Sequence, residues 1–147
     1  MATTTAINVP NQAKTYLEPG DATTCKVGAV AVLGRRFVKV STGGLGNHPV
    51  VVPAGAGERA YGVAHFDAAI GADVSVLRGN GTFEVLAGEA LTSGDAVSVG
   101  AAGVAMKAVA ASQSGTTPFA VTQATLVVGI CTADTAISVG APITLQL

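Results

Sequence analysis

The glycine-rich loop over residues 55–60, Gly-Ala-Gly-Glu-Arg-Ala, comes nearest to a chemical motif in this chain. It matches G-x-G-x-x-A, the fingerprint of dinucleotide-binding folds, and it follows the apolar run Val50–Val52. The fingerprint holds a pyrophosphate only where a helix begins directly after it, because the helix N-terminus supplies the amide groups. Here Tyr61–Phe66 has the pattern of a strand, and Gly71 arrives too early for a helix. We therefore predict a turn and no nucleotide site.

Histidines and carboxylates are too scattered to predict a metal or acid–base site. His48 and His65 are the only histidines, and no cluster of cysteines or carboxylates accompanies them. Asp67 and Asp134 each come after an apolar run and before a glycine, where aspartate usually accepts hydrogen bonds from turn N–H groups. A paired-carboxylate site is the alternative for these two residues, and we prefer the turn role.

Nucleophilic side chains are present without the partners that catalysis needs. Serine and threonine are frequent, but none lies in a G-x-S-x-G elbow and none has a plausible base. Cys25 and Cys131 have neither zinc nor redox spacing, and we predict buried, reduced thiols. We expect no enzyme activity, no catalytic residue, no metal and no cofactor.

Arg35, Arg36 and Lys39 form a small basic cluster. Nucleic-acid sites need more positive charge and stacking aromatics, whereas this chain has a net charge of −1, a pI near 6.0 and 4% aromatic residues. We predict a solvated strand edge or a contact between subunits, and no nucleic-acid partner.

Charge is scarce throughout and nearly absent from the second half. Only 12% of the 147 residues are charged, against 49% hydrophobic, and between residues 96 and 147 only Lys107 and Asp134 carry charge. A monomer normally distributes charge over its surface. We therefore expect this half to be covered in an assembly, with a homotrimer as the predicted state. No apolar run reaches the roughly 20 residues of a membrane span, and the N-terminus lacks signal-peptide features, so no membrane partner is expected.

Around 126 residues of short strands and turns follow an N-terminal stretch of different character. Residues 1–21 are polar, contain two prolines and lack periodicity, which predicts an extended arm. The arm carries four apolar residues spaced like anchors for a partner surface, and we predict that they contact a capsid or a neighbouring subunit. They are Ile7, Val9, Tyr16 and Leu17.

From residue 22 to 147 the pattern predicts one all-β domain, a small barrel or sandwich with little helix. The expected strands are Thr24–Val27, Arg36–Ser41, Val50–Val52, Ala60–Ala64, Val74–Leu77, Thr82–Leu86, Ala96–Val99, Val104–Val109, Leu126–Thr132 and Ile143–Leu147. Asn80-Gly81 is a strong signal for a hairpin turn, because both central residues of a type I′ turn need positive φ.

The domain contains an internal duplication. Residues 24–77 are echoed over residues 82–145, first at an offset of 58 to 60 and later at 67 to 69, so the second copy has an insertion near residues 111–123. Val38 is matched by Val97, and Gly62-Val63 by Gly129-Ile130. The repeated positions are apolar, glycine and turn residues, which indicates a scaffold. We predict two similar β half-repeats.

Four segments resemble the capsid decoration (cement) proteins of tailed bacteriophages. They are Tyr16–Asp21, Arg59–Ala64, Ala90–Val97 and the closing stretch from Gly129 to Leu147. The resemblance covers the chain from about residue 8. It implies a small β protein, commonly trimeric, which is made in the host cytoplasm and binds the outer surface of the capsid, where it bridges subunits of the major capsid protein.

Two other classes remain open. One is a different virion structural component, such as a head fibre base or a tail protein. The other is a hydrolase or a carbohydrate-binding module. A sugar-binding face would need exposed aromatic platforms, whereas this chain has no tryptophan and only Tyr16 and Tyr61.

Overall fold

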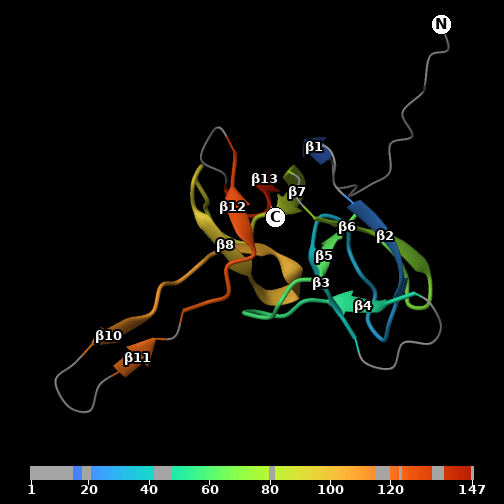
Figure 1. The fold of residues 1–147 in the computed structure, drawn as a ribbon, viewed down its shortest axis with the longest axis horizontal. Helices are drawn as coiled ribbons and strands as arrows, with labels where there is room; N and C mark the ends of the chain where they lie inside the picture. Colours follow the sequence, from blue (N-terminus) through green and yellow to red (C-terminus); the bar gives the residue numbers. More distant parts are fainter. Residues whose placement is uncertain are drawn as a thin grey trace, which may run out of the picture.

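A computed structural model of the chain describes residues 15–17, 21–41, 48–79, 82–114, 120–122, 124–133 and 138–146. These residues form an all-β fold with one short 3-10 turn, η1 (Ala101–Gly103), and they confirm the predicted fold class (Figure 1). The strands of the first half are β1 (Thr15–Leu17), β2 (Asp21–Val27), β3 (Phe37–Val40), β4 (Val50–Pro53), β5 (Gly62–Ala64) and β6 (Asp73–Arg78). Those of the second half are β7 (Thr82–Leu86), β8 (Ala96–Val99), β9 (Ala105–Lys107), β10 (Ser112–Ser114), β11 (Ala120–Thr122), β12 (Gly129–Cys131) and β13 (Pro142–Gln146).

The first half closes into a five-stranded barrel in the order β2-β4-β3-β5-β6. Neighbouring strands are antiparallel except for β2 and β4, which run parallel and close the barrel. Side chains along β2 point alternately into the barrel and to solvent, because Cys25 and Val27 are buried while Thr24 and Lys26 are exposed. The inward side chains fill a small core of Cys25, Val27, Val32, Val38, Val51, Ala64, Val74 and Val76.

The second half, together with β1 at its edge, forms a six-stranded sheet in the order β1-β7-β13-β12-β8-β9, beside a separate two-stranded hairpin of β10 and β11. A second core lies between this sheet and the barrel. It includes Phe37, Val63 and Leu77 from the barrel together with Phe83 and Leu91 from the second half. Because one core takes side chains from both halves, barrel and sheet are packed as one unit.

Both halves pair their strands in the same order. In the barrel, β2 pairs with β6, β6 with β5, β5 with β3 and β3 with β4, which returns in parallel to β2. In the second half, β7 pairs with β13, β13 with β12, β12 with β8 and β8 with β9. A parallel bridge between Ala87 and Ala105 then returns β9 to the end of β7.

The register is matched as well. Val38 lies opposite Gly62 in the first half, and Val97 lies opposite Gly129 in the second. Three backbone hydrogen bonds of the first half have a counterpart in the second. Tyr61 N–H to Val38 O (2.7 Å) corresponds to Val128 N–H to Val97 O (2.8 Å), and Gly28 N–H to Val51 O corresponds to Gly88 N–H to Ala105 O (both 2.8 Å). The third pair is Gly71 N–H to Val27 O (2.9 Å) and Gly140 N–H to Ala87 O (2.8 Å). We infer from these pairs that the two halves are copies of one unit.

The hairpin of β10 and β11 is the main departure from this correspondence. It stands between β9 and β12, in the stretch where the offset of the repeat changes, and it extends away from the body of the molecule (Figure 1). Its strands had no counterpart among the predicted ones. Ser112–Ser114 is too polar to reveal a strand by apolar alternation.

Two predictions need correction. The arm predicted over residues 1–21 includes residues that belong to the sheets, because Thr15–Leu17 pairs with β7 and Asp21 begins β2. Residues 1–14 lie outside the described residues.

The predicted hairpin turn at Asn80-Gly81 also proves wrong. These two residues lie outside the described part, but the strands on either side are not partners. Both edges of β6 are taken by β2 and β5, and both edges of β7 by β1 and β13. The chain therefore crosses here from the barrel to the six-stranded sheet.

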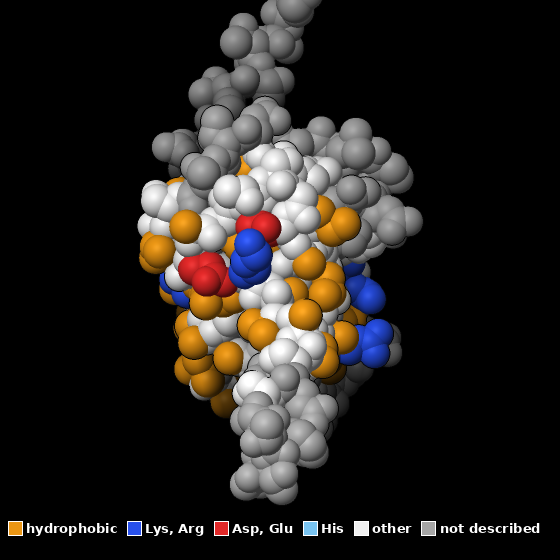
Figure 2. All heavy atoms as spheres, turned by 90° about the vertical axis from the view of Figure 1, so that its left-hand side faces the viewer, with side chains coloured by type: hydrophobic (Ala, Val, Ile, Leu, Met, Phe, Trp, Pro, Cys, Tyr) orange, Lys and Arg blue, Asp and Glu red, His pale blue; other side chains and the backbone are white. Residues whose placement is uncertain are grey.

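The side of the molecule toward the projecting hairpin carries many hydrophobic side chains and few charged ones (Figure 2). Exposed large hydrophobics of the second half are Val109, Leu126, Val127, Ile130 and Val139. No helix among the described residues is long and apolar enough to cross a membrane.

Candidate interaction site

A groove lies between the two halves on the surface of the described part of the chain. It encloses about 440 Å³ and is lined by residues 59–62, Arg78, Gly79 and residues 126–128. The segments 59–62 and 126–129 occupy equivalent places in the two halves, because Gly62 pairs with Val38 as Gly129 pairs with Val97. The groove therefore lies between two equivalent segments, residues 59–62 of the first half and residues 126–128 of the second.

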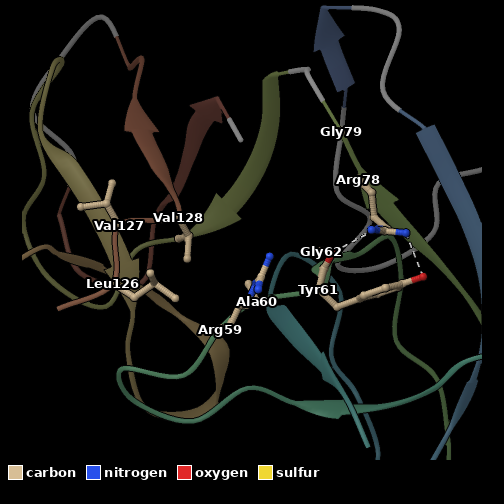
Figure 3. A pocket seen from close by; sticks show the side chains of 9 residues that line it. All are labelled: Arg59, Ala60, Tyr61, Gly62, Arg78, Gly79, Leu126, Val127 and Val128. Carbon is tan, nitrogen blue, oxygen red and sulfur yellow. Dashed lines mark hydrogen bonds between the residues drawn. The ribbon is translucent and has the colours of Figure 1, made fainter.

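The barrel side of the groove is basic and aromatic. The Arg78 guanidinium lies 3.8 Å from the centre of the Tyr61 ring. Arg78 Nε donates to the Tyr61 carbonyl oxygen at 3.1 Å, and Nη1 donates to the Tyr61 hydroxyl at 2.9 Å (Figure 3). Two of the five guanidinium N–H donors are engaged in this way, and the group is held in a fixed orientation.

Arg59 lies between this pair and the opposite wall (Figure 3). Its side chain is exposed, and it forms no hydrogen bond or ion pair with any residue that the structure describes. The opposite wall consists of Leu126, Val127 and Val128 and is apolar, with Leu126 47% and Val127 52% exposed. At equivalent positions the two copies therefore present an arginine and a leucine.

A second hollow of about 540 Å³ adjoins the groove and shares Arg59, Ala60, Tyr61 and Arg78 with it. Its further lining residues are Lys39, Val40 and Glu58. Lys39 Nζ lies 2.6 Å from Glu58 Oε1, so these two charges offset each other. The Lys39 ammonium, followed by the Gly55 N–H group, lowers the pKa of the Glu58 carboxyl below its ordinary value.

The glycine-rich loop at residues 55–60 is a turn, as predicted. Gly57 has a φ of 72°, and no helix follows, because β5 begins at Gly62. Glu58 Oε2 accepts a hydrogen bond from the Gly55 N–H group at 2.6 Å. The Gly57 N–H group donates to the Val99 carbonyl oxygen at 2.8 Å, so this loop also ties the barrel to β8.

Asp67 accepts a backbone N–H group of a turn, but of a distant one: its Oδ1 accepts the Gly34 N–H group at 2.8 Å. Asp134 lies outside the described residues. Within the described ranges, no group of three or more histidine, cysteine or carboxylate residues could hold a metal ion.

Both cysteines are free and buried, as predicted. Cys25 lies in the barrel core and Cys131 in the core shared by both halves. Burial raises the pKa of the Cys25 thiol, against a smaller opposing influence of Arg78. A thiol of this kind is a weak nucleophile.

The basic cluster of Arg35, Arg36 and Lys39 is engaged in contacts within the chain. Arg35 Nη1 lies 3.3 Å from Glu84 Oε1 in β7, and Arg36 Nη1 donates to the Ala102 carbonyl oxygen at 3.2 Å in η1. These two arginines join the two halves of the same chain. Lys39, the third residue of the cluster, forms an ion pair with Glu58, with Nζ 2.6 Å from Oε1. A contact between subunits stays a prediction.

The four predicted contact residues are only partly within the described ranges. Ile7 and Val9 lie outside them, while Tyr16 and Leu17 belong to β1, which pairs with β7. The sequence did not indicate the groove residues as a site. The one available signal was the match of residues 59–62 with residues 126–129, which places the two segments at equivalent points of the repeat.

In class, the chain is an all-β protein with a closed five-stranded barrel, a six-stranded sheet and a groove between them. No family model matches the chain, and no curated protein matches it. Among solved structures, it is similar to the N base of the head fibre gp8.5 of bacteriophage phi29. The TM-score is 0.63, identity is 19%, and the match covers 88% of this chain and 94% of the other. The likeness shows that the two proteins share a fold.

Proposed function

We propose that the chain is a structural protein of a bacteriophage virion that binds the outer surface of the head. The observation that carries this proposal is the fold, which nearly all of the chain shares with a phage head fibre base. The sequence resemblance to phage capsid decoration proteins supports the same location independently.

The surface chemistry supports a role based on contacts. Exposed apolar side chains on the second half, such as Val127 and Ile130, stand among few charges. Burial of such side chains against another protein supplies a favourable free energy of roughly 25 cal/mol per Å² of apolar area. The partners we propose are the major capsid protein and further copies of this chain, with a homotrimer as the assembly.

Two forms of the function fit a head-surface location. The structural likeness favours the base of a head fibre, which would attach to the shell and carry a projecting element. The sequence resemblance favours a cement protein, in which each copy bridges neighbouring capsid subunits and resists the pressure of the packaged genome. In both forms, simultaneous contacts with several subunits raise the effective concentration and strengthen attachment.

The N-terminal residues are proposed to contribute to attachment. Ile7 and Val9 are apolar side chains in a polar stretch, and Tyr16 and Leu17 lie where that stretch joins the sheet at β1. A sugar-binding role is less well supported, because the ring of Tyr61 is covered by Arg78 on one face.

Purified particles test the proposal. Phage particles from a lysate of the strain that encodes the chain should contain it at a fixed ratio to the major capsid protein. A ratio near one copy per capsid subunit supports cement, whereas fewer copies with projecting density support a fibre base. Particles that lack the chain altogether would contradict both forms.

A further inference from the structure

We propose that the groove between the two halves binds an extended peptide segment of a partner protein in which acidic and apolar residues alternate. The proposal names the chemistry of a contact that the proposed function requires, and it rests on that function only for the identity of the partner.

The charges that line the groove favour an acidic ligand. The groove and its adjoining hollow contain three cationic groups, from Lys39, Arg59 and Arg78, and one carboxylate, from Glu58. Glu58 is paired with Lys39 at 2.6 Å, which leaves both arginines without a carboxylate partner among the described residues. A carboxylate in the groove could accept charge-assisted, bidentate hydrogen bonds from a guanidinium.

Arg78 is preorganised to bind an anionic group. Arg78 is fixed by two hydrogen bonds to Tyr61 and by the face of the Tyr61 ring, so little side-chain entropy is lost when it accepts a ligand. Its remaining N–H donors and those of Arg59 are available to the ligand. The tyrosine–arginine pair thus forms a rigid anion-binding side of the groove.

The opposite wall of the groove suits apolar side chains of the ligand. Leu126 and Val127 are each about half exposed and carry no polar side-chain atom. Side chains of an extended strand point alternately to opposite sides. A strand in the groove would direct its acidic residues toward Arg59 and Arg78 and its apolar residues toward Leu126 and Val127. The volume of about 440 Å³ lies within the usual range of roughly 300–1,000 Å³ for ligand sites.

This amphipathic lining favours peptide over nucleic acid. A polynucleotide would present phosphates at regular intervals, and its binding gains from a continuous basic track. Here the basic residues occupy one side only, and the opposite side is apolar. An alternating acidic and apolar strand matches both sides.

The test is a titration of the full chain with a blocked peptide, Thr-Glu-Val-Glu-Leu-Thr, followed by NMR. The expected result is saturable binding, with signal changes concentrated on the methyl groups of Leu126 and Val127 and on the Arg59 side chain. The peptide in which glutamine replaces both glutamates should bind at least roughly tenfold more weakly, because its hydrogen bonds are no longer charge-assisted. Added salt should weaken only the glutamate peptide.

Matched variants localise the effect. Arg59→Gln should weaken binding about tenfold, whereas Lys26→Gln, which removes one positive charge elsewhere on the barrel, should not change it. Val127→Ser should weaken binding roughly fivefold, while Ile70→Ser, at an exposed apolar position outside the groove, should not. All four residues are exposed, and thermal unfolding should confirm that the variants remain folded.

Three results would overturn the proposal. Equal affinity for the glutamate and glutamine peptides would show that the arginines do not recognise a carboxylate. Tighter binding of a six-nucleotide oligothymidylate through the same residues would assign the groove to single-stranded nucleic acid. A change of oligomeric mass in Arg59→Gln without any peptide binding would assign it to a second copy of the chain. Attachment to phage heads is measured separately, so failure of the groove proposal is distinguishable from failure of the proposed function.

Discussion

Arg35 and Glu84 form an ion pair that joins the barrel to the six-stranded sheet, with Arg35 Nη1 3.3 Å from Glu84 Oε1. Their side chains are only 22% and 9% exposed. The Arg35 carbonyl oxygen also accepts the Leu86 N–H group at 2.8 Å. Arg35 has a φ of 62°, an uncommon conformation for a residue with a side chain, and these contacts hold it there. The ion pair and this hydrogen bond therefore connect the barrel directly to β7.

Removal of one partner should destabilise the whole domain. Glu84→Gln removes the carboxylate charge that faces the Arg35 guanidinium at a little-exposed site, and the free energy of unfolding should fall by about 3 kcal/mol. For a chain of this size the unfolding temperature should then drop by roughly 6–12 °C. The control is Asp73→Asn, which breaks an exposed ion pair with Lys26 and should cost less than about 1 kcal/mol. Equal losses in both variants would contradict the role of the buried pair.

Two glycines with similar backbone conformations should differ sharply in their tolerance of alanine. Gly57 and Gly103 have φ values of 72° and 75°. A Cβ at Gly57 would meet nothing within 4 Å, whereas a Cβ at Gly103 would lie 2.4 Å from the Phe37 carbonyl oxygen. Gly57→Ala should cost about 1 kcal/mol for the backbone conformation alone. Gly103→Ala should cost about 2–4 kcal/mol, because β3 and η1 must move apart. Chemical denaturation measures both, and similar values would show that the two halves tolerate separation.

Stability should depend on pH through His65. Burial lowers the pKa of His65 below its ordinary value of 6.5, so the folded state favours the neutral ring. The unfolded chain then binds more protons near that pH. This contribution to stability is present above pH 6.5 and is lost as the pH falls through the folded pKa. His65→Gln should flatten the fall in unfolding temperature as the pH is lowered from 7.5 through 6.5. An unaltered slope in His65→Gln would disprove this assignment.

The oligomeric state should depend on the apolar surface of the second half. Sedimentation at micromolar concentration is expected to give a homotrimer. Ile130 is 50% exposed in β12, and Ile130→Lys should shift the distribution toward monomer by placing a charge on that surface. Ile70 is 64% exposed in the first half, and Ile70→Lys serves as the matched control. A monomeric wild-type protein at all concentrations, on and off the shell, would refute the trimer.

Deletion of residues 2–14 should separate attachment from folding. The truncated chain keeps β1 and should unfold at nearly the same temperature as the full chain. Loss of Ile7 and Val9 would remove on the order of 3 kcal/mol of burial, before ordering costs, from contact with a shell. Attachment to heads should therefore weaken at least tenfold, as measured by co-sedimentation. Undiminished attachment would exclude these residues as contacts, and an unfolded product would place them in the fold.

Prediction from sequence succeeded where local pattern determines structure. Thr82–Leu86 and Ala96–Val99 were predicted to the residue, because apolar residues and turn signals bound these strands. Asn80-Gly81 misled, since a local turn signal does not reveal that β6 and β7 already have partners on both edges.

The candidate site could not be predicted from sequence patterns for a related reason. Arg59, Arg78 and Leu126 are far apart in the chain, and only the pairing of the two copies brings them to one groove. Similarly, Arg35 and Arg36 are adjacent residues that contact different parts of the second half.

Electron cryomicroscopy of phage heads with and without this chain tests the central claim most directly. Particles from the intact phage should show density of the size of this domain on the outer face of the head, in contact with the major capsid protein. Particles from a phage that lacks the gene should lack that density and regain it when the purified chain is added. Density that is unchanged by the deletion, or located on the tail or inside the shell, would contradict the proposed function.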